Sequence, residues 1–209
     1  MSESADDDEA GAKAGSRTKP RKPPRPATQA WLQRAALYYL ERYSASSAQL
    51  QRVLARKVET RLRLRGEAGD PEIAGPAREL VADVVEQAVS GGYVDDASYA
   101  RARVAGLRRR GGSRRAIMAK LREKGLDPAL IEEALAEDIA TTQTGSNAAI
   151  DDAEARAQRE YEAAQAYARR RRLGAYRTPL QPERRDRDIA AMARAGFALQ
   201  LAIRVIDDA

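Results

Sequence analysis

The chain has no cysteine and no histidine, and only 5% of its 209 residues are aromatic. The absence of cysteine excludes disulfides, thiolate metal sites and cysteine nucleophiles, and the absence of histidine removes the commonest general base. No apolar run approaches the roughly 20 residues that cross a bilayer, and the acidic, polar start of the chain is unlike a secretory signal. We therefore expect a soluble, cytoplasmic protein with no membrane contact, cofactor or metal.

The sequence also lacks the short motifs that mark common active sites. It has no GxxxxGK[ST] phosphate loop, no GxGxxG fingerprint and no HExxH metal motif. Asp95 and Asp96 form a carboxylate pair, but adjacent residues at a helix end cannot easily face one metal ion, and no third ligand follows at a useful spacing. The pair is better explained by helix capping. We expect that the protein is not an enzyme.

What the chain does contain is an internal repeat. The apolar pattern of residues 125–135 recurs at 196–206, an offset of 71, and begins each time with a glycine. The arginine run 108–110 recurs at 170–172, an offset of 62, and Ser113 has a fainter counterpart 67 residues earlier in Ser46. Such repeats are typical of units that cannot bury an apolar face alone and stack on their neighbours.

The apolar period within each copy is helical, and no alternating strand pattern occurs. We therefore predict an all-α fold of three tandem three-helix units that form an elongated, curved helical array. The predicted parts are a disordered, acidic-then-basic, Pro-rich tail (1–28), a first unit (29–92) with a Gly/Pro insertion (59–78), a second unit (93–140), a polar linker (141–150) and a third unit (151–209).

Several helix ends can be read from the sequence. Glycines at 91–92, 111–112 and 125 follow apolar helical stripes and predict helix C-termini. Expected N-caps are Asp95 or Asp96, Ser113, and Asp127 with Pro128 at the first helical position.

Charge is distributed unevenly along the chain, whose net charge is +6. Residues 101–124 hold ten basic residues and one acidic residue, a net of +9, whereas 125–160 hold two basic and nine acidic residues, a net of −7. This separation predicts one strongly positive flank. A solvated face is the plainer interpretation, because helix C-termini favour cations in any protein, but the recurrence of the arginine run favours a repeated binding surface.

Because aromatic residues near these runs are few, we expect sequence-independent contact with the phosphate backbone of single- and double-stranded DNA rather than base stacking. An acidic protein surface is the other partner that such cations fit. The candidate contact residues are Arg101, Arg108, Arg109, Arg110, Arg114, Arg115, Lys120, Arg122 and Lys124, followed by Arg169, Arg170, Arg171 and Arg172.

Three segments together resemble one protein family: Gly92-Tyr93-Val94-Asp95-Asp96-Ala97-Ser98-Tyr99-Ala100, then Gly111-Gly112-Ser113, and Leu121-Arg122-Glu123-Lys124-Gly125-Leu126. They are similar to the RecX family of recombination regulators, over about residues 30–207. The first unit departs from the family pattern, with Lys57-Val58 in place of the usual Lys-Gly turn.

The resemblance implies three three-helix units and a non-enzymatic regulator that acts in recombination, DNA repair and the SOS response. Such a protein binds the RecA–DNA filament in its groove and limits filament growth, ATP hydrolysis and strand exchange. We expect a monomer. The family-motif residues are expected to be core and turn residues: Gly92, Tyr93, Asp95, Asp96, Tyr99, Leu121, Gly125 and Leu126.

An alternative is a helix-turn-helix transcriptional regulator, because residues 117–135 contain two helical stripes separated by Gly125. The second of these helices is acidic, which is wrong for a helix that enters a major groove.

Overall fold

The computed structural model describes residues 23–143 and 152–208, and these residues form nine α-helices, two short 3-10 helices and no strand. The elements are α1 (Gln29–Leu40), α2 (Ser47–Arg65), α3 (Pro71–Ser90), α4 (Asp96–Arg109), α5 (Arg114–Glu123), α6 (Pro128–Gln143), α7 (Asp152–Arg171), η1 (Gly174–Tyr176), η2 (Pro182–Arg184), α8 (Arg185–Arg194) and α9 (Leu199–Asp207).

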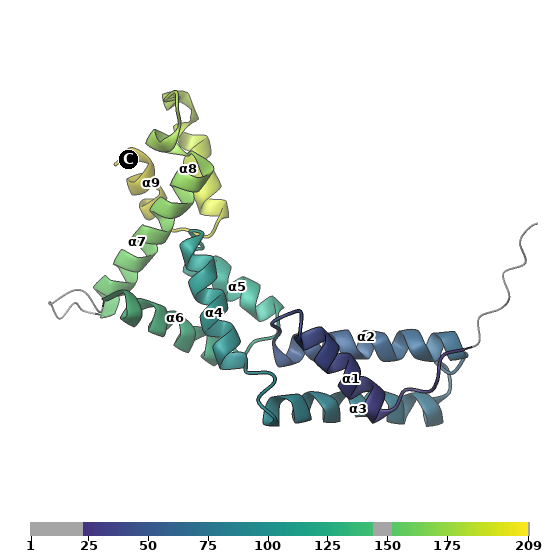
Figure 1. Cartoon of the computed structure of the whole chain (residues 1–209). Helices are drawn as coiled ribbons and strands as arrows, with labels where there is room; N and C mark the ends of the chain where they lie inside the picture. Colours follow the sequence, from purple (N-terminus) through teal and green to yellow (C-terminus); the bar gives the residue numbers. More distant parts are fainter. Residues whose placement is uncertain (1–22, 144–151, 209) are drawn as a thin grey trace, which may run out of the picture.

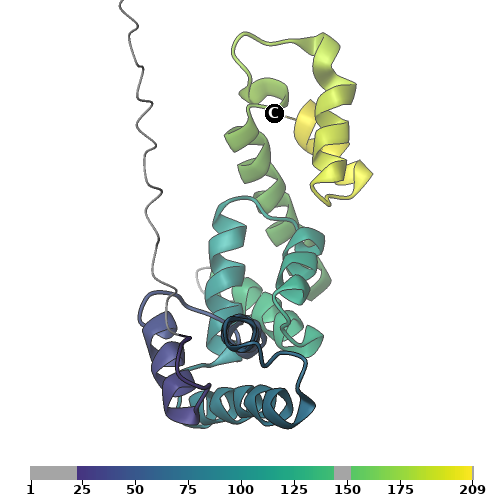
Figure 2. The ribbon, with the colours of Figure 1, turned by 90° about the vertical axis from the view of Figure 1, so that its right-hand side faces the viewer.

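The helices form three groups that follow one another along a bent, elongated molecule, as two perpendicular views show (Figures 1 and 2). We name these groups unit 1 (α1–α3), unit 2 (α4–α6) and unit 3 (α7–α9). Each unit has its own apolar core, with Leu54 buried in unit 1, Leu135 in unit 2 and Met192 in unit 3. The predicted fold class is confirmed.

The N-caps expected from the sequence are confirmed. Asp95 rather than Asp96 caps α4, since its Oδ1 accepts hydrogen bonds from two amides of the first turn at 2.9 and 3.0 Å. Ser113 Oγ accepts from the amide three residues on at 3.2 Å, and Asp127 Oδ1 accepts from the amide of Ala129 at 2.7 Å. These caps satisfy amides that have no partner inside the helix.

The inserted residues of unit 1 lengthen two helices. Helix α2 has 19 residues and α3 has 20, whereas their counterparts α5 and α6 have 10 and 16. Gly66, with a φ of 74°, ends α2, and Asp70 and Pro71 begin α3. Of the predicted insertion 59–78, only residues 66–70 lie outside a helix.

The described part of the N-terminal segment, residues 23–28, departs from the prediction of a disordered tail. The Pro24 carbonyl accepts a hydrogen bond from Arg65 at 2.6 Å, and the Pro26 carbonyl accepts one from Arg61 at 3.4 Å. These contacts hold residues 23–28 against α2. Residues 1–22 of the predicted tail and 144–150 of the predicted linker lie outside the described residues, and 141–143 belong to α6.

The same hydrogen bond joins each unit to the next. Ser46, the N-cap of α2, donates from Oγ to the Lys124 carbonyl at 2.8 Å, and Ser113, the N-cap of α5, donates to the Ala195 carbonyl at 2.7 Å. Both serines are buried. The two serines are counterparts in the sequence repeat, so the repeat also encodes how its copies join.

Each accepting carbonyl precedes a glycine that ends the middle helix of its unit. Gly125 and Gly196 have φ values of 83° and 93°, a region that side chains disfavour. A Cβ at Gly125 would lie 2.4 Å from Ala48 Cβ, and one at Gly196 would lie 2.6 Å from Ser113 Oγ. Glycine is therefore required at both joints, for conformation and for space.

A carboxylate completes each joint. Asp96 Oδ1 accepts from the Ser47 amide at 2.8 Å, and Glu160 accepts from the Arg114 amide at 3.1 Å. Asp96 also accepts from the Ser47 hydroxyl at 2.5 Å. Of the adjacent aspartates, Asp95 thus begins α4 while Asp96 ties α4 to unit 1, and both are structural.

Candidate nucleic-acid interface

The nine basic residues predicted on unit 2 do not all face solvent as free cations. They lie on α4, on α5 and on the residues that end these helices. Helix α6, which carries four of the nine acidic residues of 125–160, packs along α4 and α5. Charges that are separated along the chain are therefore brought together in space, and the flank is less positive than the sequence predicts.

Arg108 corrects the predicted contact set. It is 4% exposed, and its guanidinium donates to Glu160 Oε2 at 2.6 Å and to the Gly112 carbonyl at 3.1 Å. Its Nε lies 3.7 Å from Asp138 Oδ2. A side chain buried in this way cannot reach a phosphate, so Arg108 is a structural residue between units 2 and 3.

Two further arginines of the predicted set are paired with α6. Arg114 forms an ion pair with Glu132, and Arg101 Nε lies 3.7 Å from Glu137 Oε2. Both pairs are partly exposed, so they contribute little stability and a stronger anion can compete for either arginine. Their cations are compensated in the free protein, however, and they are weaker candidates than their neighbours.

The other six cations of the unit 2 set have no ion pair with any carboxylate in the described ranges 23–143 and 152–208. Five are exposed and Lys124 is half-buried. We name this set the basic face of unit 2: Arg109, Arg110, Arg115, Lys120, Arg122 and Lys124.

The arginine run of unit 3 is exposed at the end of α7 and accompanied by tyrosines. Arg169 to Arg172 are all exposed. The Arg169 guanidinium carbon lies 5.4 Å from the Tyr176 ring centroid, and that of Arg170 lies 5.8 Å from the Tyr167 ring centroid. The run has more aromatic neighbours than the sequence predicts, because η1 folds Tyr176 back toward the end of α7.

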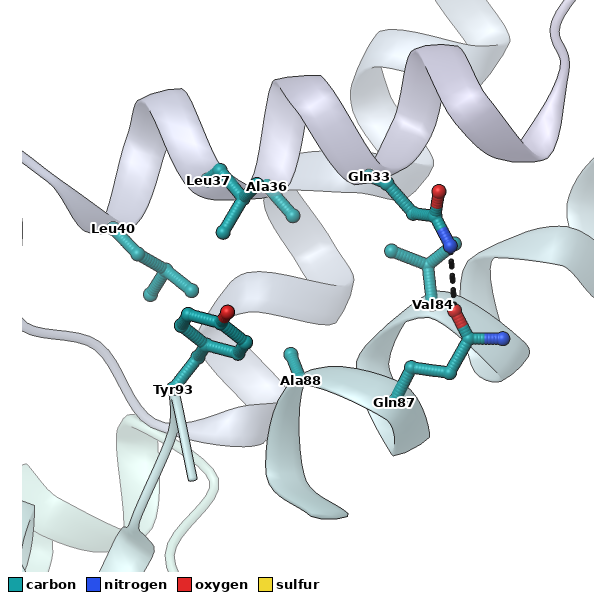
Figure 3. A pocket seen from close by; sticks show the side chains of 8 residues that line it. All are labelled: Gln33, Ala36, Leu37, Leu40, Val84, Gln87, Ala88 and Tyr93. Carbon is teal, nitrogen blue, oxygen red and sulfur yellow. Dashed lines mark hydrogen bonds between the residues drawn. The ribbon is translucent and has the colours of Figure 1, made fainter. Parts of the chain in front are cut away.

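Most of the family-motif residues have the structural positions expected. Tyr99, Leu121 and Leu126 are buried in the core of unit 2, and Gly92 and Gly125 have positive φ values. Tyr93 is an exception, because it is 64% exposed rather than part of the core. Its ring closes one end of an apolar groove between α1 and α3 (Figure 3), whose other residues are Gln33, Ala36, Leu37, Leu40, Val84, Gln87 and Ala88.

Unit 1 carries a basic groove that the sequence pattern does not predict. It is lined by Pro24, Trp31, Arg56, Lys57, Thr60, Arg61 and Leu64. The Arg61 guanidinium carbon lies 3.6 Å from the Trp31 ring centroid. Burial, and secondarily the charge of Arg65, lowers the pKa of Arg61. The basic residues of α2 are scattered among apolar positions and do not form a run, so charge counting along the chain did not single them out.

The described residues offer no cluster of three or more metal-ligating carboxylates, and no helix among them is long and apolar enough to span a membrane. The Ser98 hydroxyl, with help from the Ser98 and Ala97 amides, lowers the pKa of Asp95 below its ordinary value of 3.8. That direction fits a capping carboxylate that stays ionised rather than an acid–base catalyst.

The fold and the exposed arginines define an all-α protein of tandem three-helix units that presents a repeated basic surface. A family model described as "RecX, second three-helix domain" matches residues 95–135, which lie in unit 2. The chain is also 37% identical over 188 residues to "Regulatory protein RecX" of Myxococcus xanthus (strain DK1622), with 89% of each chain covered. The chain belongs to the RecX family. No solved structure matches it.

Proposed function

We propose that the protein regulates RecA by binding the RecA–DNA filament, and that it inhibits filament growth, ATP hydrolysis and strand exchange during recombination, DNA repair and the SOS response. The observation that carries this proposal is a pair of exposed arginine clusters at equivalent places in two successive units. Arg109 and Arg110 lie at the C-terminal end of the first helix of unit 2, and the run 169–172 lies at the C-terminal end of the first helix of unit 3.

A repeated surface suits a partner that is itself a polymer. Each cluster gains modest energy from one phosphate or acidic site, and two clusters held at a fixed separation gain affinity by acting together. Arginine suits phosphate because its planar fork donates two hydrogen bonds at once. We infer that the face meets the backbones of single- and double-stranded DNA without reading sequence, and that the protein acts as a cytoplasmic monomer.

The helix-turn-helix alternative has less support. Its second helix would be α6, whose Glu132 and Glu137 pair with arginines of α5 and α4. The turn before α6 contains Gly125, which lies directly against α2 of unit 1. An acidic helix that is packed in this way is a poor fit to a major groove.

The test is RecA-dependent ATP hydrolysis and strand exchange, measured with sub-stoichiometric amounts of this protein. We expect both rates to fall. Replacing two cations of the basic face (Arg109→Gln with Arg110→Gln) should weaken the inhibition and flatten its salt dependence by a slope of about 2 on duplex DNA. The matched control, Arg34→Gln with Arg42→Gln, removes the same charge from exposed positions in α1 and in the turn that follows it, and should inhibit like the unmodified protein.

Rates that stay unchanged at saturating protein would overturn the proposal. Binding to one defined duplex sequence, with no effect on RecA, would instead support the transcriptional alternative.

A further inference from the structure

The basic groove of unit 1 lies outside the residues matched by the family model and outside the two arginine clusters of units 2 and 3. Three segments form it: residue 24 of the extended N-terminal stretch, the first turn of α1, and the exposed side of α2 between residues 56 and 64. Its chemistry differs from that of the basic face of unit 2, because its cations lie beside a tryptophan ring and an exposed leucine.

The cations of the groove are uncompensated. Arg56 and Lys57 are exposed, and neither forms an ion pair within the described ranges. Arg61 stacks on the Trp31 ring and donates to the Pro26 carbonyl at 3.4 Å, and it forms no ion pair with any carboxylate of the described residues.

The carboxylates on α2 and just after it are already paired with other arginines. Glu59 is held by Arg78 and Glu67 by Arg65, each at 2.6 Å. Three cations close together without anions destabilise the free protein and are relieved by a polyanion.

The walls of the groove are apolar. Leu64, in the last turn of α2, is 64% exposed. Trp31 is half-buried, and Pro24 stands on the other side. A flat aromatic side chain next to a stacked guanidinium and an exposed aliphatic chain is the kind of surface on which an unstacked base packs.

We propose that this groove binds single-stranded nucleic acid, with phosphates at Arg56 and Lys57 and a base against Trp31 and Leu64. A duplex keeps its bases stacked and out of reach of such walls, and the carboxylate side chains of an acidic peptide supply no flat apolar group to pack on them. The inference rests on the proposed function, because it adds a further contact with the DNA strand of the filament. The test of the groove does not use RecA, so the groove proposal and the proposed function can be refuted independently of each other.

Trp31 is the sole tryptophan of the chain, so its fluorescence reports on the groove alone. The full chain is titrated with an oligothymidylate of about 16 nucleotides, and binding is followed in parallel by anisotropy of a labelled strand. We expect the fluorescence of Trp31 to be quenched with the same midpoint as the anisotropy change. Full binding with no change in Trp31 fluorescence would overturn the proposal.

Two pairs of substitutions distinguish binding at the groove from a general effect of positive charge. Arg56→Gln with Lys57→Gln removes about two phosphate contacts, which on single strands lowers the salt slope by about 1.4 and, near 0.1 M salt, the affinity by roughly 25-fold. The matched control, Arg187→Gln with Arg194→Gln, removes two exposed cations of α8 that form no ion pair in the described part of the chain. Equal losses in both pairs would refute a dedicated groove.

Leu64→Ala tests the apolar wall at a position too exposed to threaten folding. It should weaken oligothymidylate binding several-fold while leaving the salt slope unchanged, and an unaltered affinity would argue against base packing. A duplex with the same number of phosphates, or polyglutamate, should reverse the quenching of Trp31 poorly, even where the duplex binds the basic face of unit 2. Competition by either one at equal charge would assign the groove to that ligand and overturn the single-strand proposal. Normal RecA inhibition by a groove variant that no longer binds would leave the proposed function intact.

Discussion

Arg108 and Arg109 are neighbours in the sequence with opposite structural roles, and exchanging each for alanine should produce opposite phenotypes. Arg108 is buried between units 2 and 3, where it contacts Glu160, the Gly112 carbonyl and, less closely, Asp138. Arg109 is exposed and has no carboxylate partner among the described residues. Arg108→Ala should therefore cost stability, and Arg109→Ala should cost affinity for the filament.

The magnitude for Arg108 follows from what its removal leaves behind. Truncating one partner of a buried ion pair costs about 3–5 kcal/mol when the other charge is stranded. Here neither carboxylate is left without a partner, because Asp138 still pairs with Arg159 at 2.8 Å and Glu160 still accepts from the Arg114 amide at 3.1 Å. We expect a loss of about 2–3 kcal/mol, or roughly 5–10 °C in Tm for a chain of this size.

The assay is urea unfolding followed by far-UV circular dichroism, with the DNA affinity of each variant measured on folded protein. Arg109→Ala should unfold within about 0.5 kcal/mol of the unmodified chain. Arg108→Lys should lie between the two, because it retains the charge but not the fork that serves several acceptors. If Arg108→Ala were no less stable than Arg109→Ala, the buried pair would not hold units 2 and 3 together and the reasoning would be refuted.

Three further outcomes are expected. Gly125→Ala should lower the free energy of unfolding in urea by about 2–4 kcal/mol, because a side chain there is strained at positive φ and overlaps the Cβ of Ala48. A loss below about 1 kcal/mol would show that the joint relaxes freely. Ser113→Ala should lose about 1–3 kcal/mol, because it removes both a cap and the hydrogen bond to unit 3, and a neutral result would mean that water replaces the hydroxyl. In carboxyl NMR, the pKa of Asp95 should lie below its ordinary value of 3.8. The contribution of Asp95 to stability is therefore full above that pH and is lost as the pH falls through the lower pKa of the folded state. Ser98→Ala should raise the pKa of Asp95 again, and an unchanged pKa would contradict the assigned cause.

The fold could be predicted from the sequence because its signals are local. Capping by Asp95, Ser113 and Asp127 and the left-handed turn at Gly125 depend on residues within one helix turn, and the repeat then relates the units to one another. The sequence could not choose between Asp95 and Asp96 as the cap. That choice depends on unit 1, whose Ser47 binds Asp96.

The candidate site was less predictable because exposure is a tertiary property. A run of arginines looks uniform in sequence, yet Arg108 is buried by Glu160, a residue 52 positions away. Tyr93 shows the reverse error, since a motif aromatic expected in the core lies at the surface. The groove of unit 1 was missed because its members come from three segments, and only folding brings Trp31 beside Arg61.

The paired joints at Ser46 and Ser113 also fix the distance between successive units. The same hydrogen bond closes both joints, and both serines are buried. The arginine clusters of units 2 and 3 are therefore held at a set separation rather than carried on a flexible linker. A polymer whose repeat does not match that separation contacts one cluster at a time and loses the gain in affinity that comes from binding both clusters.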